Sequence, residues 1–231
     1  MKFLKDTIKS FTRFEWCLLI GSYLAIILPF VFLGNKDYLT LAASLIGVSS
    51  LALISKGNVL GQGVSIVFGI IYAIIAYSYK YYGEMIIYLC GNIPICIASI
   101  IAWIKNPYKD KKIEVKISIL RKKDWIMLAA SSLVFGVAFY FILKAFDTNN
   151  LIVSVFSVFT GYIAAYLMIK RSEYYAVAYA VNDIALIILW ALAAAKEISF
   201  LPMACCFGAF LANDIYGFIN WSRTKRTQKK E

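Results

Sequence analysis

Apolar residues fill eight long stretches of this chain, and short polar segments separate them. The stretches cover 14–33, 38–55, 59–79, 85–104, 125–143, 151–169, 174–195 and 199–221. Most have the length of about 20 residues that a helix needs to cross a hydrocarbon core about 30 Å thick. The first stretch is too long for the core of a signal peptide, so we expect a retained helix. The pattern predicts an all-α integral membrane protein with eight spans.

The basic residues predict the orientation of these helices. With the N-terminus in the cytoplasm, 20 of the 24 lysines and arginines fall on the cytoplasmic side. Only Lys36, Lys80, Lys144 and Lys196 lie outside, as the positive-inside rule requires. Both termini are therefore expected in the cytoplasm. The net charge of +11 reflects this topology, and no nucleic-acid partner is expected.

Two groups of three helices share a pattern. "IGVSSLALISKGN" (46–58) aligns with "TGYIAAYLMIKRS" (160–172), and the third helices end in "IIAWIK" and "FINWSR". Three helices reverse the side of the chain, so two units of equal orientation need one linking helix between them. We expect parallel repeats, a plan used by carriers that bind substrate between their halves.

This reasoning divides the chain into five parts. They are an N-terminus with an extra helix (1–37), a first repeat (38–105), a basic loop with the linker helix (106–148), a second repeat (149–222) and a basic tail (223–231).

Polar residues gather near the middle of three predicted spans. Asp183 and Asp214 are the only carboxylates deep within any span, and asparagines accompany them. A charged group at the bilayer centre costs at least about 2.5 kcal/mol, so such residues face a bundle interior or a wet cavity. The shared depth predicts a substrate site.

Helical spacing sorts the polar residues into stripes. Asn213, Tyr216 and Asn220 share one face, whereas Asp214 lies one residue round and is assigned to helix packing. Each asparagine has a second interpretation, as a hydrogen-bonding contact between helices worth about 0.6 kcal/mol.

Other residues carry structural predictions. Trp103 and Trp221, near span ends, are expected as anchors at the membrane interface. Pro94 predicts a kink that serves gating or is merely static, and Gly69 serves either a hinge or close packing.

Several kinds of chemistry are excluded. The chain has no histidine, its five cysteines form no CxxC pair, and "GQG" (61–63) lacks the lysine of a phosphate-binding loop. We expect no metal, no cofactor and no ATP-driven step.

Two motifs resemble the PnuC family of bacterial vitamin transporters. They are "KGNVLGQGVSIVFGIIYAIIAYSYKYYGEM" (56–85) and "NDIYGFINW" (213–221). The resemblance implies three helices, a linker and three helices, as in SWEET carriers. It also implies facilitated diffusion of nicotinamide riboside across the bacterial cell membrane, trapping by a cytoplasmic kinase, and a homotrimer.

Carried over by position, the resemblance places substrate-binding residues on three helices. They are Asn92, Cys96, Asn182, Asp183, Trp190, Asn213, Tyr216 and Asn220. Segment 85–104 departs from the family because glutamines and aromatic residues are few there. Deoxynucleosides, thiamine or riboflavin therefore stay open as cargo.

Two rival functions remain at this stage. Asp183 and Asp214 could share a proton as in an intramembrane aspartyl protease, although both follow asparagine instead of that class's motifs. A scaffold or receptor would bind ligand without flux. Among carrier substrates, an ionised Asp183 would favour a cation.

Overall fold

The computed structural model describes residues 7, 10–34, 37–78, 85–108, 111–148 and 150–230. This part of the chain forms eight apolar α-helices, one of them preceded by a π-helical turn. Six helices are long and apolar enough to cross a membrane, and the stretches 38–54 and 59–75 form shorter apolar helices. The predicted all-helical membrane architecture is confirmed.

The elements follow one another as α2 (Arg13–Phe32), α3 (Tyr38–Ile54), α4 (Val59–Ser78), the π-helix η1 (Ile87–Asn92), α6 (Ile93–Ile104), β1 (Pro107–Tyr108), β2 (Lys111–Val115), α7 (Lys122–Ala145), α8 (Leu151–Ile169), α9 (Tyr174–Ala194), the 3-10 turn η2 (Ile198–Phe200) and α10 (Leu201–Lys230).

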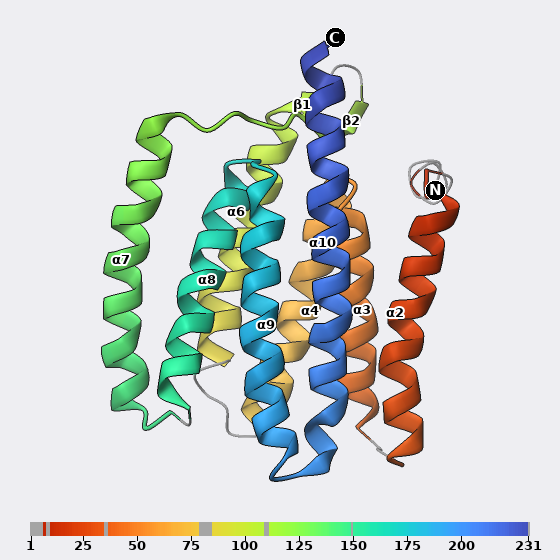
Figure 1. Ribbon diagram of the computed structural model, residues 1–231, viewed down its shortest axis with the longest axis vertical. Coiled ribbons are helices and arrows are strands. Elements are labelled where there is room, and N and C mark those ends of the chain that lie inside the picture. The colour runs from red at the N-terminus through yellow and green to blue at the C-terminus, as the bar shows by residue number, and fades with distance from the viewer. Residues whose placement is uncertain are drawn as a thin grey trace.

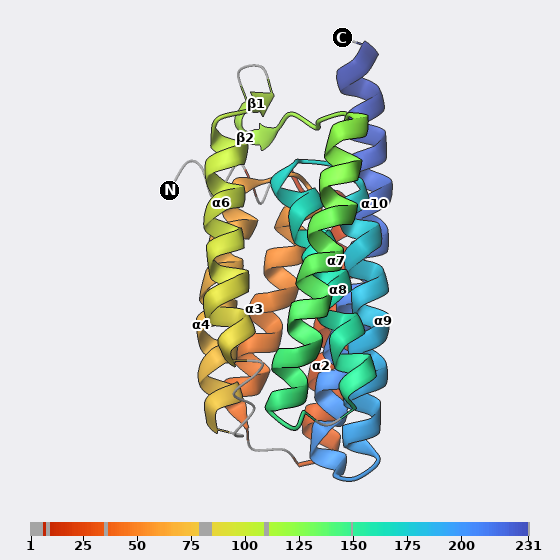
Figure 2. The same ribbon diagram turned by 90° about the vertical axis from the view of Figure 1, so that its left-hand side faces the viewer.

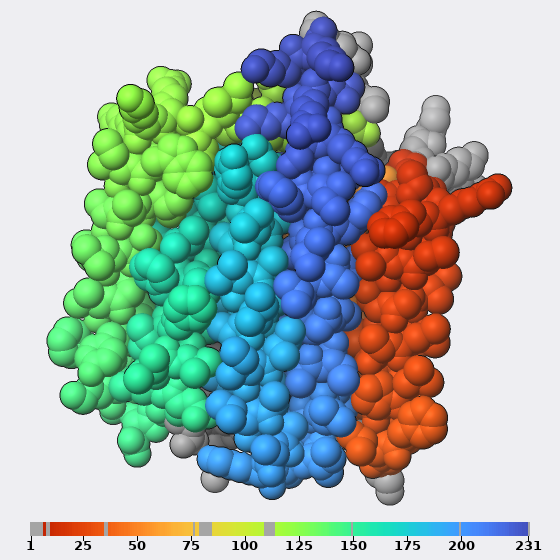
Figure 3. All heavy atoms as spheres, viewed as in Figure 1, coloured from red at the N-terminus to blue at the C-terminus, as the bar shows by residue number. Residues whose placement is uncertain are grey.

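The helices form one elongated bundle (Figure 1). In it α9 packs between α8 and α10, α3 packs on α4, and α2 leans on α10 and α3. A view from the side places α4 and α6 at one edge of the bundle (Figure 2). On the face shown in Figure 3, α8, α9, α10 and α2 lie side by side.

One end of the bundle carries the strand pair β1–β2, and we call it the hairpin end. The start of α2 and the last turns of α10 lie at this same end (Figure 1). The sequence predicted only a basic loop between α6 and α7, whereas β1 and β2 pair antiparallel there. Helix α10 also continues beyond the predicted segment, to Lys230.

Two acids begin helices and also tie down lysines. The Glu15 carboxylate accepts the backbone N–H of Thr12 at 2.6 Å at the start of α2, and Asp124 has the corresponding position in α7. Lys56, after α3, pairs with Glu15 at 2.8 Å, and Lys170, after α8, pairs with Asp124 at 2.8 Å. Hydrogen bonding to Asp124 raises the pKa of the Lys170 ammonium. Each predicted three-helix unit is thus linked to the helix before it in the same way.

Pro94 does disturb its span. The six residues Ile87–Asn92, which precede it on the same span, form the π-helix η1. Proline has no N–H to donate to the preceding turn, and wider π turns are one way a helix accommodates the loss. Gly69 lies in continuous helix, and a Cβ there would meet Ile93 at an ordinary 3.5 Å.

The expectation that Trp103 and Trp221 anchor the membrane interface is wrong. Both are buried, with 0% and 1% of their surface exposed. Their rings lie 5.4 Å apart. The Trp103 indole N–H donates to the Met168 carbonyl at 3.2 Å, and that of Trp221 donates to the Ile54 carbonyl at 3.0 Å. Ile54 and Met168 have the same place in the aligned segments 46–58 and 160–172, so the two bonds are reciprocal.

Candidate substrate site

Asp183 and Asp214 meet between α9 and α10. Their carboxyl groups lie close enough to interact with each other, and only 3% and 4% of the two residues is exposed. The Oδ2 atom of Asp183 has no hydrogen-bond partner. Asp214, which the stripe analysis assigned to packing, is therefore the partner of Asp183. A buried carboxylate oxygen without a donor is costly and points to a group that it could bind.

Polar side chains from three helices lie near this pair. The Tyr179 hydroxyl lies within electrostatic range of both carboxyls and of Cys96 on α6. The Tyr175 hydroxyl also lies within electrostatic range of Asp214, and the Cys206 thiol lies within electrostatic range of Asp183. Cys96 in turn contacts Asn92, its thiol 3.1 Å from the amide oxygen. The candidates Asn92, Cys96 and Asp183 therefore lie around one region.

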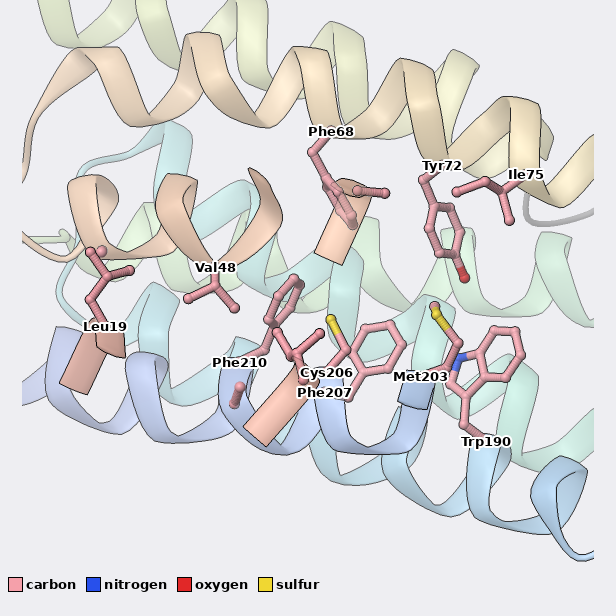
Figure 4. Close-up of a cluster of buried hydrophobic side chains, with 14 residues drawn as sticks. Leu19, Val48, Phe68, Tyr72, Ile75, Trp190, Met203, Cys206, Phe207 and Phe210 are labelled. Atoms are coloured by element: carbon pink, nitrogen blue, oxygen red, sulfur yellow. The ribbon is translucent and has the colours of Figure 1, made fainter. Parts of the chain in front are cut away.

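Aromatic side chains lie beside the pair, beyond Cys206. Figure 4 shows Phe68 and Tyr72 on α4 pointing towards Trp190 on α9 and Phe207 on α10. The rings of Phe68 and Tyr72 lie 5.6 Å apart, and those of Tyr72 and Tyr88 only 4.3 Å apart. Trp190 belongs to the same buried cluster. We call these side chains the aromatic cluster, and their flat faces suit a planar ring.

Four other predicted site residues form hydrogen bonds to neighbouring helices or helix ends. Asn182 donates to the Ser157 carbonyl on α8 at 2.6 Å. Asn213 donates to Ser22 Oγ on α2 at 2.9 Å, and the Tyr216 hydroxyl donates to Glu15 on the same helix at 2.8 Å. Asn220 donates to the Ser55 carbonyl at 2.8 Å. The structure thus turns the Asn213–Tyr216 stripe towards α2, and a ligand contact by these four residues stays a prediction.

A cavity of about 340 Å³ opens at the hairpin end. Its lining includes Lys56, Glu114, Asn220, Trp221 and Thr224. Asn220 therefore faces this cavity instead of the carboxyl pair. The volume falls within the range of small-molecule sites. The buried Trp103 ring, against Trp221, forms part of the packing behind it.

Sequence reasoning missed the residues of α4. Phe68 and Tyr72 stand four positions apart, and so share one face of a helix, but nothing in the sequence told that this face meets α9 and α10. Tyr179 was missed too. It lies four residues before Asp183, a spacing that could have identified it.

The metal-binding potential of the described residues is also clear. They contain no group of three or more histidine, cysteine or carboxylate side chains that could hold a metal ion. The carboxyl pair alone offers too few ligands.

Comparison with known proteins identifies the family. Residues 37–223 match the family model described as nicotinamide mononucleotide transporter. The chain is 28% identical over 235 residues to the nicotinamide riboside transporter PnuC of Neisseria mucosa, covering 95% of this chain and 84% of that protein. It is also similar to the crystal structure of the vitamin B3 transporter PnuC, with a TM-score of 0.84, 25% identity and 99% of both chains covered. The chain therefore belongs to the nicotinamide mononucleotide transporter family, as a PnuC-like multi-pass membrane transporter and not an enzyme.

Proposed function

We propose that this protein carries nicotinamide riboside by facilitated diffusion, as a uniporter. The observation that supports it is the buried Asp183 carboxylate oxygen without a partner, beside the aromatic cluster. The pyridinium ring of nicotinamide riboside is flat and positively charged. Trp190 and Tyr72 would stack on its faces, and Asp183 would attract its charge. A neutral deoxynucleoside would stack on the aromatic rings but would gain no charge attraction from Asp183.

The aromatic cluster also supplies what segment 85–104 lacks in sequence. Phe68 and Tyr72 come from α4, and Tyr88 from η1 packs against both. A wall poor in aromatic residues was the reason to consider deoxynucleosides. With these rings in place, nicotinamide riboside is the better candidate.

The reciprocal tryptophan bonds support two parallel repeats. We infer that α3, α4 and α6 form one unit and α8, α9 and α10 the other, with α7 as the linker in a SWEET-like plan. Each bond joins the third helix of one unit to the first helix of the other. The basic loop, the basic tail and the start of α2 share the hairpin end, which we assign to the cytoplasm by the positive-inside rule (Figure 1).

Two partners follow from this proposal. A cytoplasmic kinase that phosphorylates the riboside would prevent its return and keep the gradient downhill. The cavity beside Lys56 and Trp221 would be the exit towards it. A homotrimer in the bacterial membrane is the proposed assembly.

Uptake into proteoliposomes tests the proposal. Purified protein should accelerate entry of radiolabelled nicotinamide riboside over empty vesicles, without ATP and with saturation. Trp190→Ala should abolish most of this uptake, whereas Trp16→Ala, at an exposed position of α2, should leave it intact. Faster entry of thymidine than of the riboside would reassign the cargo, and no entry of either would refute the carrier function.

The protease alternative makes the same prediction of two neighbouring aspartates, and the structure does bring them together. Membership of a transporter family decides against it. Uptake by the intact protein, without cleavage of a model transmembrane peptide, would agree with a transporter and not with a protease.

A further inference from the structure

Two buried polar side chains, one on α4 and one on α6, are not satisfied by the packing around them. Gln62, in the first turn of α4, and Ser99, near the end of α6, are each 0% exposed. Neither Gln62 Oε1 nor Ser99 Oγ has a hydrogen-bond partner among the residues that the structure describes. An unpaired polar atom at a buried position is costly, so both atoms point to a group that they could bind.

Ser99 differs from two other buried serines of the bundle. A serine within a helix can satisfy its hydroxyl on a carbonyl one turn earlier in the same helix. The hydroxyl of Ser50 donates to the Gly47 carbonyl at 2.7 Å, and that of Ser132 donates to the Ala129 carbonyl at 3.1 Å. Ser99 makes no such bond, although it lies inside α6. Its hydroxyl is therefore available to a group outside its own helix.

The packing of α4 explains why Gln62 points into the bundle. At Gly61, a Cβ atom would lie 2.7 Å from the backbone nitrogen of Ile54 and would clash with it. The glycine thus lets α4 pack directly on α3, and the next residue round the helix points towards α8 instead. There the Gln62 amide nitrogen contacts the sulfur of Met168, which is only a weak acceptor. The carbonyl end of the same amide has no partner among the described residues.

Gln62 and Ser99 lie on adjacent helices and near the same residue of α8. Helices α4 and α6 pack against each other at one edge of the bundle (Figure 2). Gln62 contacts the side chain of Met168. One turn after Ser99 on α6, the indole of Trp103 donates to the carbonyl of that methionine. Both unpaired atoms thus belong to one layer of the bundle, between the hairpin end and the level of Cys96.

This layer adjoins the proposed position of the ring. Phe68, in the aromatic cluster, follows Gln62 by six residues on α4, a rise of about 9 Å. Cys96, near Asn92, precedes Ser99 by one turn of α6. A ribose extends about one helical turn, or about 5 Å, beyond the ring that carries it. With the ring at the aromatic cluster, the sugar would reach the layer of Gln62 and Ser99.

We propose that Gln62 and Ser99 bind the ribose of the substrate. One sugar hydroxyl donates to Gln62 Oε1, and a second forms a hydrogen bond with Ser99 Oγ. An amide carbonyl only accepts, whereas a serine hydroxyl donates or accepts, so the two groups together suit a sugar with several hydroxyls. Asp183 interacts with the charge of the ring, and these two residues distinguish a riboside from the ring alone. The inference rests on the proposed cargo, nicotinamide riboside.

The binding of two cations with the same ring tests this inference. Nicotinamide riboside carries a ribose on the ring nitrogen, and 1-methylnicotinamide carries a methyl group there. Calorimetry measures the affinity of the purified protein for each. Gln62→Met and Ser99→Ala should each weaken binding of the riboside about tenfold, as expected for one lost hydrogen bond, and leave 1-methylnicotinamide unchanged. Ser132→Ala, at a buried serine that bonds its own helix, is the control and should change neither affinity.

Deoxy forms of the riboside identify the bonded hydroxyls. The 2′-, 3′- and 5′-deoxy ribosides each lack one hydroxyl. The form without the hydroxyl that Gln62 binds should bind the unaltered protein about tenfold more weakly than the riboside, and Gln62→Met should weaken it no further. The same relation should hold between Ser99→Ala and a second deoxy form. If a variant fails to fold, the three deoxy forms still decide on the unaltered protein.

The outcomes separate this inference from the proposed function. Variants that weaken the riboside and 1-methylnicotinamide equally, or that change neither, would show that the two residues do not bind the sugar. Equal affinity of the unaltered protein for the riboside and all three deoxy forms would also overturn the inference. Both results would leave the cargo standing. Failure of the riboside itself to bind would refute the cargo.

Discussion

The two proposed units, 38–105 and 149–222, agree at the hairpin end and differ at mid-depth. Trp103 and Trp221 make the same indole bond to the opposite unit. Seven residues before each tryptophan, however, the first unit has Cys96 and the second has Asp214. Both are buried. The shared part is the framework that joins the units, and the part that differs is the one we assign to substrate recognition.

This difference has a physical reason. A contact that links two parallel units across an axis can be made twice at no extra cost, because each copy satisfies the other unit's carbonyl. A single small ligand on that axis meets both units and is itself asymmetric. One side can then offer aromatic rings from α4 and the other a carboxyl pair from α9 and α10.

The largest expected effect comes from removing either buried ring. Trp103→Ala and Trp221→Ala should each destabilise the protein by about 3–5 kcal/mol, because each leaves a large cavity and removes a buried hydrogen bond to a carbonyl of the other unit. Thermal and denaturant unfolding in detergent micelles measures the loss. Trp16→Ala, at a side chain 40% exposed, is the control and should change little. A large loss in only one of the two would break the equivalence of the units.

The two lysines should differ more than the tryptophans do. Lys56 and Glu15 are 16% and 5% exposed, whereas Lys170 and Asp124 are 39% and 20% exposed. Lys56→Met leaves the buried Glu15 carboxylate without the positive charge of Lys56 and should cost about 3 kcal/mol. Lys170→Met should fall within the scatter of the same unfolding measurement, because solvent screens that pair. Equal losses would show that α2 and α7 are held alike.

A carboxyl placed in the first unit sharpens the contrast at mid-depth. Cys96→Asp adds a buried acid without a basic partner and should cost at least about 2.5 kcal/mol. The yield of folded protein in membranes and its unfolding temperature are the measurements. Cys96→Ser keeps the size and should be well tolerated. A stable Cys96→Asp protein would mean that the region admits water.

The smallest effect isolates the indole bonds from the rings. Trp103→Phe and Trp221→Phe each lose one hydrogen bond and should cost about 1 kcal/mol. The double variant then measures the coupling through the ring contact at 5.4 Å. Additive losses in this cycle would show that the two rings do not stabilise each other.

The sequence predicted the helices well because lipid imposes a simple rule on length and polarity. Eight apolar stretches became eight helices, and Pro94 coincides with a real distortion. The extension of α10 to Lys230 was not foreseen, because its last turns are polar and are held by packing. Gln228 there donates to the Val115 carbonyl at 3.2 Å and accepts the Ile117 N–H at 2.9 Å.

The site was harder to predict than the helices. Depth along the chain singled out Asp183 as buried polarity, but the direction of each side chain depends on how a helix is rotated in the bundle. One residue of rotation separates Asn213, whose amide donates to Ser22 on α2, from Asp214, whose carboxyl interacts with Asp183 on α9. An asparagine that bonds a neighbouring helix and one that bonds a ligand have the same sequence pattern. The sequence therefore did not distinguish these two roles for Asn182 and Asn213.

The length of α10 makes it a lever. Its 30 residues span about 45 Å, and roughly 24 Å of that separates Asp214 from Lys230. A tilt of about 10° around mid-depth would therefore displace the far end by about 4 Å, a helix-geometry estimate. Gln228 forms hydrogen bonds to the backbone of Val115, in β2, and of Ile117, just after it. The hairpin must therefore move with α10 or lose both bonds. Motion at the buried carboxyls is thus amplified at an exposed part of the chain, where a spin label could report it.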